Sequence, residues 1–251
     1  MNYTLFFAII NLILISRLCF TMRDEGISGQ KDILWLTIIP LLILPLLNLN
    51  LSWVLLAVYL LLIRPAAILF LEKNKNKLNQ KRLLALFAHI LVIGFLASPL
   101  FDLKVADWVS AAENGFVDLF FTGEPFLHWQ YFHAVLFGFL MALNESNIAI
   151  RTILEKLDLT PLSNDYHEID KKQFRTGRVI GFLERIFVFL FILLNQYTAI
   201  GFIIAAKGVV RYPDFGKKSF NEYILIGTLL SVLFAMLFAF ITTLLSVHFL
   251  S

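Results

Sequence analysis

The sequence predicts an all-α protein, a single polytopic helical membrane domain with six or seven transmembrane segments, and three observations support this. Hydrophobic residues make up 59% of the 251 residues and charged residues 16%, whereas soluble domains average about 45–50% and about 25%. The apolar residues occur in runs near the length of about 20 residues that a membrane-spanning helix needs. Lysine and arginine gather in several of the connections, as they do on the cytoplasmic side of membrane proteins.

Seven apolar runs are candidate membrane helices. No basic segment precedes the first run and no small-residue cleavage site follows it, so we expect a retained helix rather than a signal peptide. The second and third runs are separated only by Asn48–Asn50, which predicts a tight hairpin, and Pro40 and Pro45 predict a kink in the second run. The runs are 3–20, 33–48, 51–71, 83–101, 129–143, 179–206 and 223–247.

The charges of the connections predict the orientation of the chain. Residues 72–82 carry five lysines and arginines against one glutamate, and residues 144–178 carry six basic residues, so both are expected to be cytoplasmic loops. Residues 102–128 carry five acidic residues against one lysine and are expected to form an outer loop, with an interfacial helix in the part rich in Trp and Phe. The N-terminus is then expected outside.

The run 179–206 conflicts with this charge rule. If it spans the membrane once, the basic residues of 207–218 lie outside. If it instead turns back at Asn195–Tyr197, residues 207–222 stay in the cytoplasm, and the turn must be buried in protein or face water. Length alone favours the single span.

Small residues recur at four-residue spacing in residues 177–239, which we call the signature region. Such spacing lets helix backbones approach closely in lipid. We therefore expect close packing within the chain, with the seam of a homo-oligomer as the alternative. The residues are Gly177, Gly181, Gly201, Ala205, Gly227, Ser231, Ala235 and Ala239.

The signature region also carries ionisable residues at the ends of its apolar runs. Charges near hydrocarbon normally pair or face a wet cavity. Structural interpretations are that Glu184 pairs with Arg178 or a neighbouring helix, that Arg185 reaches the headgroups, and that Lys207 pairs with Glu222. The functional interpretation is a polar path, in which Lys207 and Arg211 bind lipid headgroups or another anionic ligand. Its candidate residues are Glu184, Arg185, Lys207, Arg211 and Glu222.

Other kinds of site find no support in the sequence. Cys19 is the single cysteine, and His128 and His133 are five residues apart, on different faces of a helix; we therefore expect no metal site and no cofactor. No HExxH, GxSxG or Walker sequence occurs, so no catalytic residue is predicted. The net charge of +3 is spread over the loops, and nucleic-acid binding is not expected.

The signature region resembles the C-terminal part of a family of uncharacterised bacterial polytopic membrane proteins, catalogued as a domain of unknown function. The resemblance lies in the order and spacing of Gly177–Arg185, Asn195–Phe202, Ala205–Lys207, Arg211 and Glu222–Ser231. It implies a location in the bacterial inner membrane and supplies no activity.

The function expected from these features is permeation or transport through a polar path near the last two apolar runs. The alternative is a non-transporting scaffold or effector whose 144–178 loop meets a cytoplasmic protein partner. An intramembrane enzyme ranks third. Membrane lipid is an expected partner in each case.

Overall fold

The protein is helical throughout the part that the computed structural model describes, which is residues 3–21, 27, 29–73, 77–109, 129–158, 171–211 and 218–250. The chain divides into two compact units, one of residues 1–140 with 245–251 and one of residues 141–244. Among the described residues, β pairing is limited to an isolated antiparallel bridge between Leu47 and Val105. The all-α prediction is confirmed.

Among the described residues, four helices are long and apolar enough to cross a membrane, namely Leu51–Lys73, Leu78–Leu96, Gln130–Lys156 and Leu225–Ser246. In the first of these, only 39% of the most apolar stretch is buried, so most of its apolar side chains face outward. That is the pattern of a helix in lipid, where outward-facing residues need not be polar. Tyr3–Leu18 and Tyr197–Val209 are shorter apolar helices. The prediction of six or seven spans stays a prediction.

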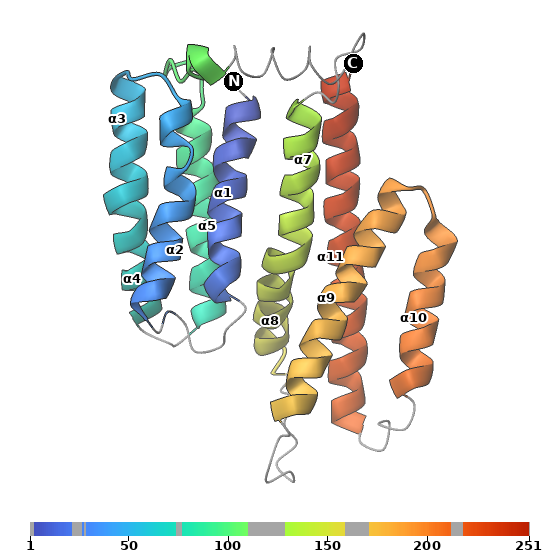
Figure 1. The fold of residues 1–251 in the computed structure, drawn as a ribbon. Helices are drawn as coiled ribbons and strands as arrows, with labels where there is room; N and C mark the ends of the chain where they lie inside the picture. Colours follow the sequence, from blue (N-terminus) through green and yellow to red (C-terminus); the bar gives the residue numbers. More distant parts are fainter. Residues whose placement is uncertain are drawn as a thin grey trace. The chain divides into compact units, whose positions relative to one another are not determined.

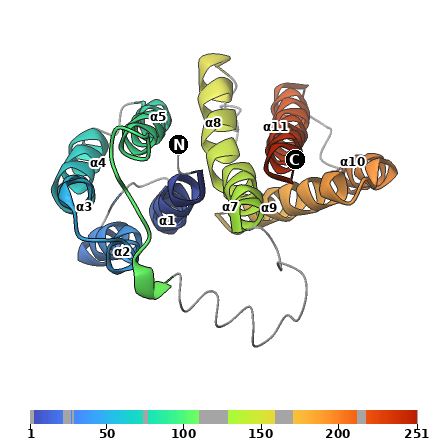
Figure 2. The same ribbon diagram turned by 90° about the horizontal axis from the view of Figure 1, so that it is seen from above.

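The helices of the first unit form an up-and-down bundle around a common interior (Figures 1 and 2). α1 contacts α2, α5 and α7, and α4 contacts α2 and α5. The interior is filled by fully buried aliphatic residues such as Ile9, Ile13, Leu56 and Ile93. The helices are α1 (Tyr3–Thr21), α2 (Gln30–Leu41), α3 (Leu51–Val58), η2 (Tyr59–Ile63), α4 (Arg64–Lys73), α5 (Leu78–Leu96) and α7 (Trp129–Leu140).

Two of the predicted runs differ from the observed helices in where a helix ends or in how it continues. α2 ends at Leu41, just after Pro40, and a short 3₁₀ turn, η1 (Leu44–Leu46), replaces the expected last helical turns. α3 and α4 join through η2, which is a π-helical turn. The predicted hairpin is present: Asn50 precedes α3, and its side chain accepts a hydrogen bond of 2.8 Å from the backbone N–H of Trp53.

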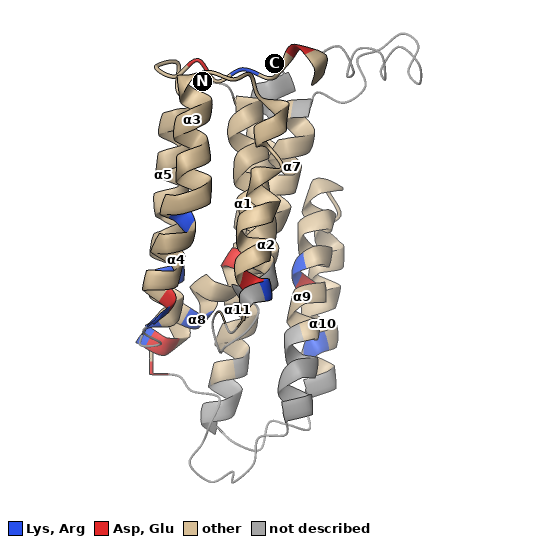
Figure 3. Ribbon diagram, turned by 60° about the vertical axis from the view of Figure 1, so that its left-hand side comes forward, with Lys and Arg blue, Asp and Glu red and all other residues tan. Residues whose placement is uncertain are grey.

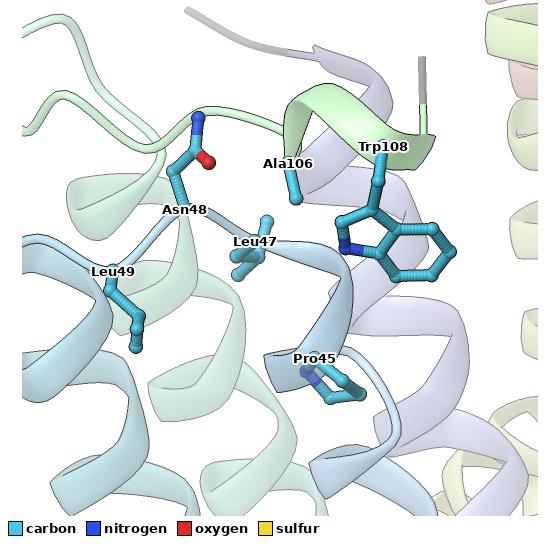
Figure 4. A pocket seen from close by; sticks show the side chains of 6 residues that line it. All are labelled: Pro45, Leu47, Asn48, Leu49, Ala106 and Trp108. Atoms are coloured by element: carbon cyan, nitrogen blue, oxygen red, sulfur yellow. The ribbon is translucent and has the colours of Figure 1, made fainter. Parts of the chain in front are cut away.

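The α2–α3 connection packs against the segment that follows α5. The backbone N–H of Asn48 donates to the carbonyl of Lys104 (3.0 Å), and that of Ala106 donates to the carbonyl of Leu46 (2.9 Å). A shallow, largely apolar pocket of about 420 Å³ opens here (Figure 4). No charged group lines it. Its lining residues are Pro45, Leu47, Asn48, Leu49, Ala106 and Trp108.

The second unit contains the main departure from the predicted topology. Residues 179–206 do not form one helix: α9 (Lys171–Leu193) ends in a turn and α10 (Tyr197–Arg211) runs back alongside it (Figure 1). Asn195 takes a left-handed conformation with φ of 57°, which asparagine adopts more readily than most residues. The backbone N–H of Gln196 then bonds the carbonyl of Phe191 (2.7 Å). The single continuous helix that length favoured is not formed, and the turn lies where the alternative placed it.

The segment 144–178, expected to be a cytoplasmic loop, is helical over most of its described length. α7 continues through a π-helical turn, η3 (Met141–Glu145), into α8 (Ser146–Lys156), and α9 already begins at Lys171. Residues 159–170 lie outside the described residues, as do residues 110–128 of the expected outer loop and interfacial helix. The last helix is α11 (Lys218–Leu250).

Candidate functional site

The polar site of the second unit centres on an ion pair between the two arms of the α9–α10 hairpin. Lys207 Nζ lies 2.6 Å from Glu184 Oε2, and the two side chains are 15% and 9% exposed. Glu184 lies 11 residues before Asn195, and Lys207 lies 11 residues after Gln196. At about 1.5 Å of rise per residue, both are about 16 Å from the turn. The antiparallel hairpin therefore brings Glu184 and Lys207 to the same level along its two arms.

Arg185 faces a different neighbour from Glu184. Its Nη1 lies 3.3 Å from the hydroxyl of Ser231 on α11, and the side chain is 6% exposed. Successive residues point about 100° apart around a helix, so α9 can direct Glu184 to α10 and Arg185 to α11. Among the described residues, Arg185 Nε has no hydrogen-bond partner. The guanidinium is thus buried with spare donor capacity.

Gly181 lies next to this guanidinium. It lies one turn before Arg185, and a Cβ added to it would be 3.8 Å from Arg185 Nη1. Ser231, on the small-residue stripe of α11, accepts the bond from the other side. Gly181 and Ser231 therefore both lie beside the charged side chain of Arg185, and not only at a contact between helix backbones.

The other predicted small residues lie in mixed environments. A Cβ at Gly227 would be 3.9 Å from the Leu154 side chain of α8, and Ala235 and Ala239 are fully buried. Gly201 and Ala205 instead lie on an exposed face of α10; a Cβ at Gly201 would meet nothing within 4 Å in the described part of the chain. The surroundings of Gly177 are outside what the structure describes.

The five residues of the predicted polar path are partly brought together. Lys207 pairs with Glu184 on α9, which is the expected pairing of Glu184 with a neighbouring helix. The side chains of Arg211, Glu222 and Arg178 lie outside the described residues. Figure 3 shows that charged positions lie part-way along both arms of the hairpin.

The sequence reasoning missed a buried carboxylate in the second unit. Glu145 lies in η3 and is 2% exposed, next to the equally buried Asn144, whose amide donates to it (2.8 Å). α9 contacts this turn. Residue 145 had been counted as part of a loop, although an acidic residue directly after an apolar run was available as a signal.

The larger omission concerns three buried arginines in the first unit. Arg17, Arg64 and Arg82 are 1%, 0% and 3% exposed. Arg82 pairs with Glu72 at 2.8 Å, and Arg17 donates to the carbonyl of Arg82 (3.0 Å). The signal was Arg64 itself, a charge inside the run 51–71, because an ionisable residue within a membrane span normally has a function.

No group of three or more metal-binding side chains occurs among the described residues. Comparisons with protein-family models, with curated proteins and with solved structures found no match for this chain.

Proposed function

We propose that the chain is a multi-pass protein of the bacterial inner membrane, in which the α9–α10 hairpin borders a permeation path for a small polar or charged solute. The observation that carries this proposal is the buried Glu184–Lys207 pair, with Arg185 beside it. Charges held at membrane depth pair with each other or border a wet path. The bacterial location rests on the resemblance of residues 177–231 to bacterial membrane proteins.

The hairpin gives the proposed topology. α10 has 15 residues, about 22 Å of helix, which is short of the roughly 30 Å hydrocarbon core. A hairpin with such an arm enters and leaves the membrane on one side. Residues 207–218 then lie on the cytoplasmic side with the start of α9, which removes the conflict with the positive-inside rule.

The full proposed arrangement has six spans and one re-entrant hairpin. The spans are α1, α2 extended by η1 (residues 30–46), α3–α4, α5, α7–α8 and α11, with both termini outside. This count agrees with the lower end of the range expected from hydropathy.

The hairpin tip also suits a path for a polar solute. Asn195, Gln196 and Tyr197 are exposed at the turn, and Tyr197 donates to the Asn195 side chain (3.1 Å). Polar, irregular backbone is tolerated at membrane depth only beside protein or water. In the proposed arrangement, this tip is the innermost part of the path and the Glu184–Lys207 pair lies nearer its entrance.

Flux measurements test the proposal. Purified protein is incorporated into liposomes carrying, in separate experiments, proton, potassium and chloride gradients. The decisive variant is Glu184→Gln with Lys207→Gln, because it removes both members of the ion pair together. Lys104→Gln is the matched control, since Lys104 forms an exposed pair with Asp102 in the first unit.

The expected result is that the wild type dissipates at least one gradient faster than empty liposomes do. The double variant should lower that rate at least tenfold at equal incorporation and equal helicity, and the control should not. Equal flux in wild type and double variant would refute the path at this pair. A wild type that passes none of the three ions would favour the scaffold alternative.

A further inference from the structure

We propose that Arg185 makes the proposed path selective for anions, so that its solute is a small inorganic anion of the chloride class. This inference rests on the proposed function and adds to it the charge of the solute. Two observations carry it: the charge balance among the side chains of the second unit, and the position of Arg185 beside the Glu184–Lys207 pair.

The Glu184–Lys207 pair by itself favours neither sign of charge. Lys207 Nζ lies 2.6 Å from Glu184 Oε2, so a positive and a negative charge are in direct contact. Their opposite effects on a passing ion largely cancel at any distance greater than their separation. A preference of the path for one sign must therefore come from another charge.

Arg185 supplies a charge that is not cancelled by contact. Its Nη1 donates to the neutral hydroxyl of Ser231 (3.3 Å), and its Nε has no hydrogen-bond partner among the described residues. The neighbouring carboxylate of Glu184 is engaged by Lys207. Because Arg185 is only 6% exposed, water and salt screen its charge weakly.

The other described charges of the second unit leave this excess in place. Arg151 on α8 is half-buried and acts electrostatically on Arg185 with the same sign, whereas the buried Glu145 in η3 has the opposite sign. Both have interactions of their own, and counted together they add no net charge. The remaining described charges of α8 and the turn after it are exposed and screened by solvent; they are Glu155, Lys156 and Asp158.

The interior charge of the second unit is therefore positive. Among the side chains that the structure describes there, three bases are buried or half-buried, and two acids are. Arg185 is the base that remains when Lys207 is counted with Glu184 and Arg151 with Glu145.

Arg185 is also close enough to act on a solute at the pair. It follows Glu184 directly in α9, which puts the two Cα atoms about 3.8 Å apart, and the two side chains act on each other electrostatically. An ion beside the pair is then on the order of one helix diameter, about 10 Å, from the guanidinium. In a poorly screened interior, a charge at that distance attracts an anion and repels a cation.

This role does not require contact between Arg185 and the solute. The side chain points to α11 and acts through its field, so it is a specificity-determining residue and not a ligand. Arginine and lysine side chains give pores their preference for anions, and a fixed arginine also excludes protons and other cations. The same charge therefore opposes a path for protons or potassium.

Ion fluxes from liposomes test the sign of the selectivity. Chloride efflux is measured with valinomycin carrying the balancing potassium, and potassium efflux is measured in separate liposomes with a protonophore carrying the balancing charge. The wild type should pass chloride about tenfold faster than potassium. Arg185→Gln should lower this ratio about tenfold, Arg185→Lys should keep the preference for chloride because the charge remains, and Lys104→Gln in the first unit is the matched control.

A second variant neutralises Arg185 without removing it. Ser231→Asp puts a carboxylate where the hydroxyl now lies 3.3 Å from Nη1, so it should lower the chloride preference as Arg185→Gln does. Ser231→Asn, which has a similar shape and no charge, is the reference for this change. The pair of Ser231 variants provides the test even if Arg185→Gln fails to fold.

The outcomes separate this inference from the proposed function. A wild type that passes potassium faster than chloride would overturn the anion selectivity and leave the permeation path standing. A chloride preference that persists in folded Arg185→Gln or in Ser231→Asp would overturn the role of Arg185. A wild type that passes neither ion would overturn the proposed path and this inference with it.

Discussion

Replacing Lys207 by Met removes one partner of the buried pair and leaves Glu184 without its cation. Breaking a buried ion pair in this way destabilises a protein by about 3–5 kcal/mol, because the remaining charge stays desolvated. Lys207 is still 15% exposed and Glu184 9%, so we expect the lower end, about 3 kcal/mol. Glu184→Gln should cost a similar amount, since it leaves the ammonium unpaired.

The double variant makes this prediction sharp. Glu184→Gln with Lys207→Met contains neither charge and should unfold no more easily than either single variant. The coupling energy is then at least about 3 kcal/mol, at the upper end of what contacting residues show. Reversible unfolding in mixed detergent micelles, as a full double-mutant cycle, measures it. A coupling below about 1 kcal/mol would equal that of a surface pair and would refute the buried geometry.

Three further predictions concern local contacts and topology. Asn50→Ala should destabilise the first unit by about 1 kcal/mol, because the cap on the Trp53 N–H is lost; chemical unfolding measures this. Gly181→Ala should be neutral or slightly stabilising, because its Cβ makes an ordinary contact of 3.8 Å with Arg185, whereas Gly181→Leu should cost about 1–3 kcal/mol through overpacking. In the proposed topology the hairpin returns the chain to the cytoplasm, so a cysteine at Ser219 should react with an impermeant maleimide only after lysis.

The Asn50 and Ser219 predictions have matched controls. Ser52, buried near Asn50, reports whether Ala substitution in that turn is disruptive in itself. For the labelling experiment, Cys19 is replaced by Ala, a cysteine at Lys104 serves as the outer reference, and one at Lys73 serves as the cytoplasmic reference. Labelling at Ser219 that matches the Lys104 position in intact cells would contradict the hairpin topology.

Run lengths predicted the helices of the first unit well, because long apolar segments must form helices in lipid. They could not predict the α9–α10 turn: 179–206 is long enough to span, and the local signal was only Asn195–Tyr197. The pairing of Glu184 with Lys207 follows from that turn and could not be seen without it.

Arg64 was missed for a different reason. The helix Leu51–Lys73 has a mean hydropathy of 2.5 over its most apolar stretch, and an average of this kind hides a single charge. The π-helical turns η2 and η3 leave no mark in hydropathy at all, because they change which carbonyl an N–H meets and not which residues are apolar.

The π-helical turn before Arg64 amounts to one surplus residue in an otherwise regular helix. If Tyr59–Ile63 closed as a regular α-helix with no residue removed, every position of α4 would be rotated by about 100°. Arg64 would leave its hydrogen-bond partners Ser16 and Leu36 and turn toward lipid, while the outward-facing Leu69 and Phe70 would turn toward other surroundings. The π-helical turn therefore sets the rotational phase of α4, and its conversion to a regular α-helical turn would separate Arg64 from its bundle without changing any side chain.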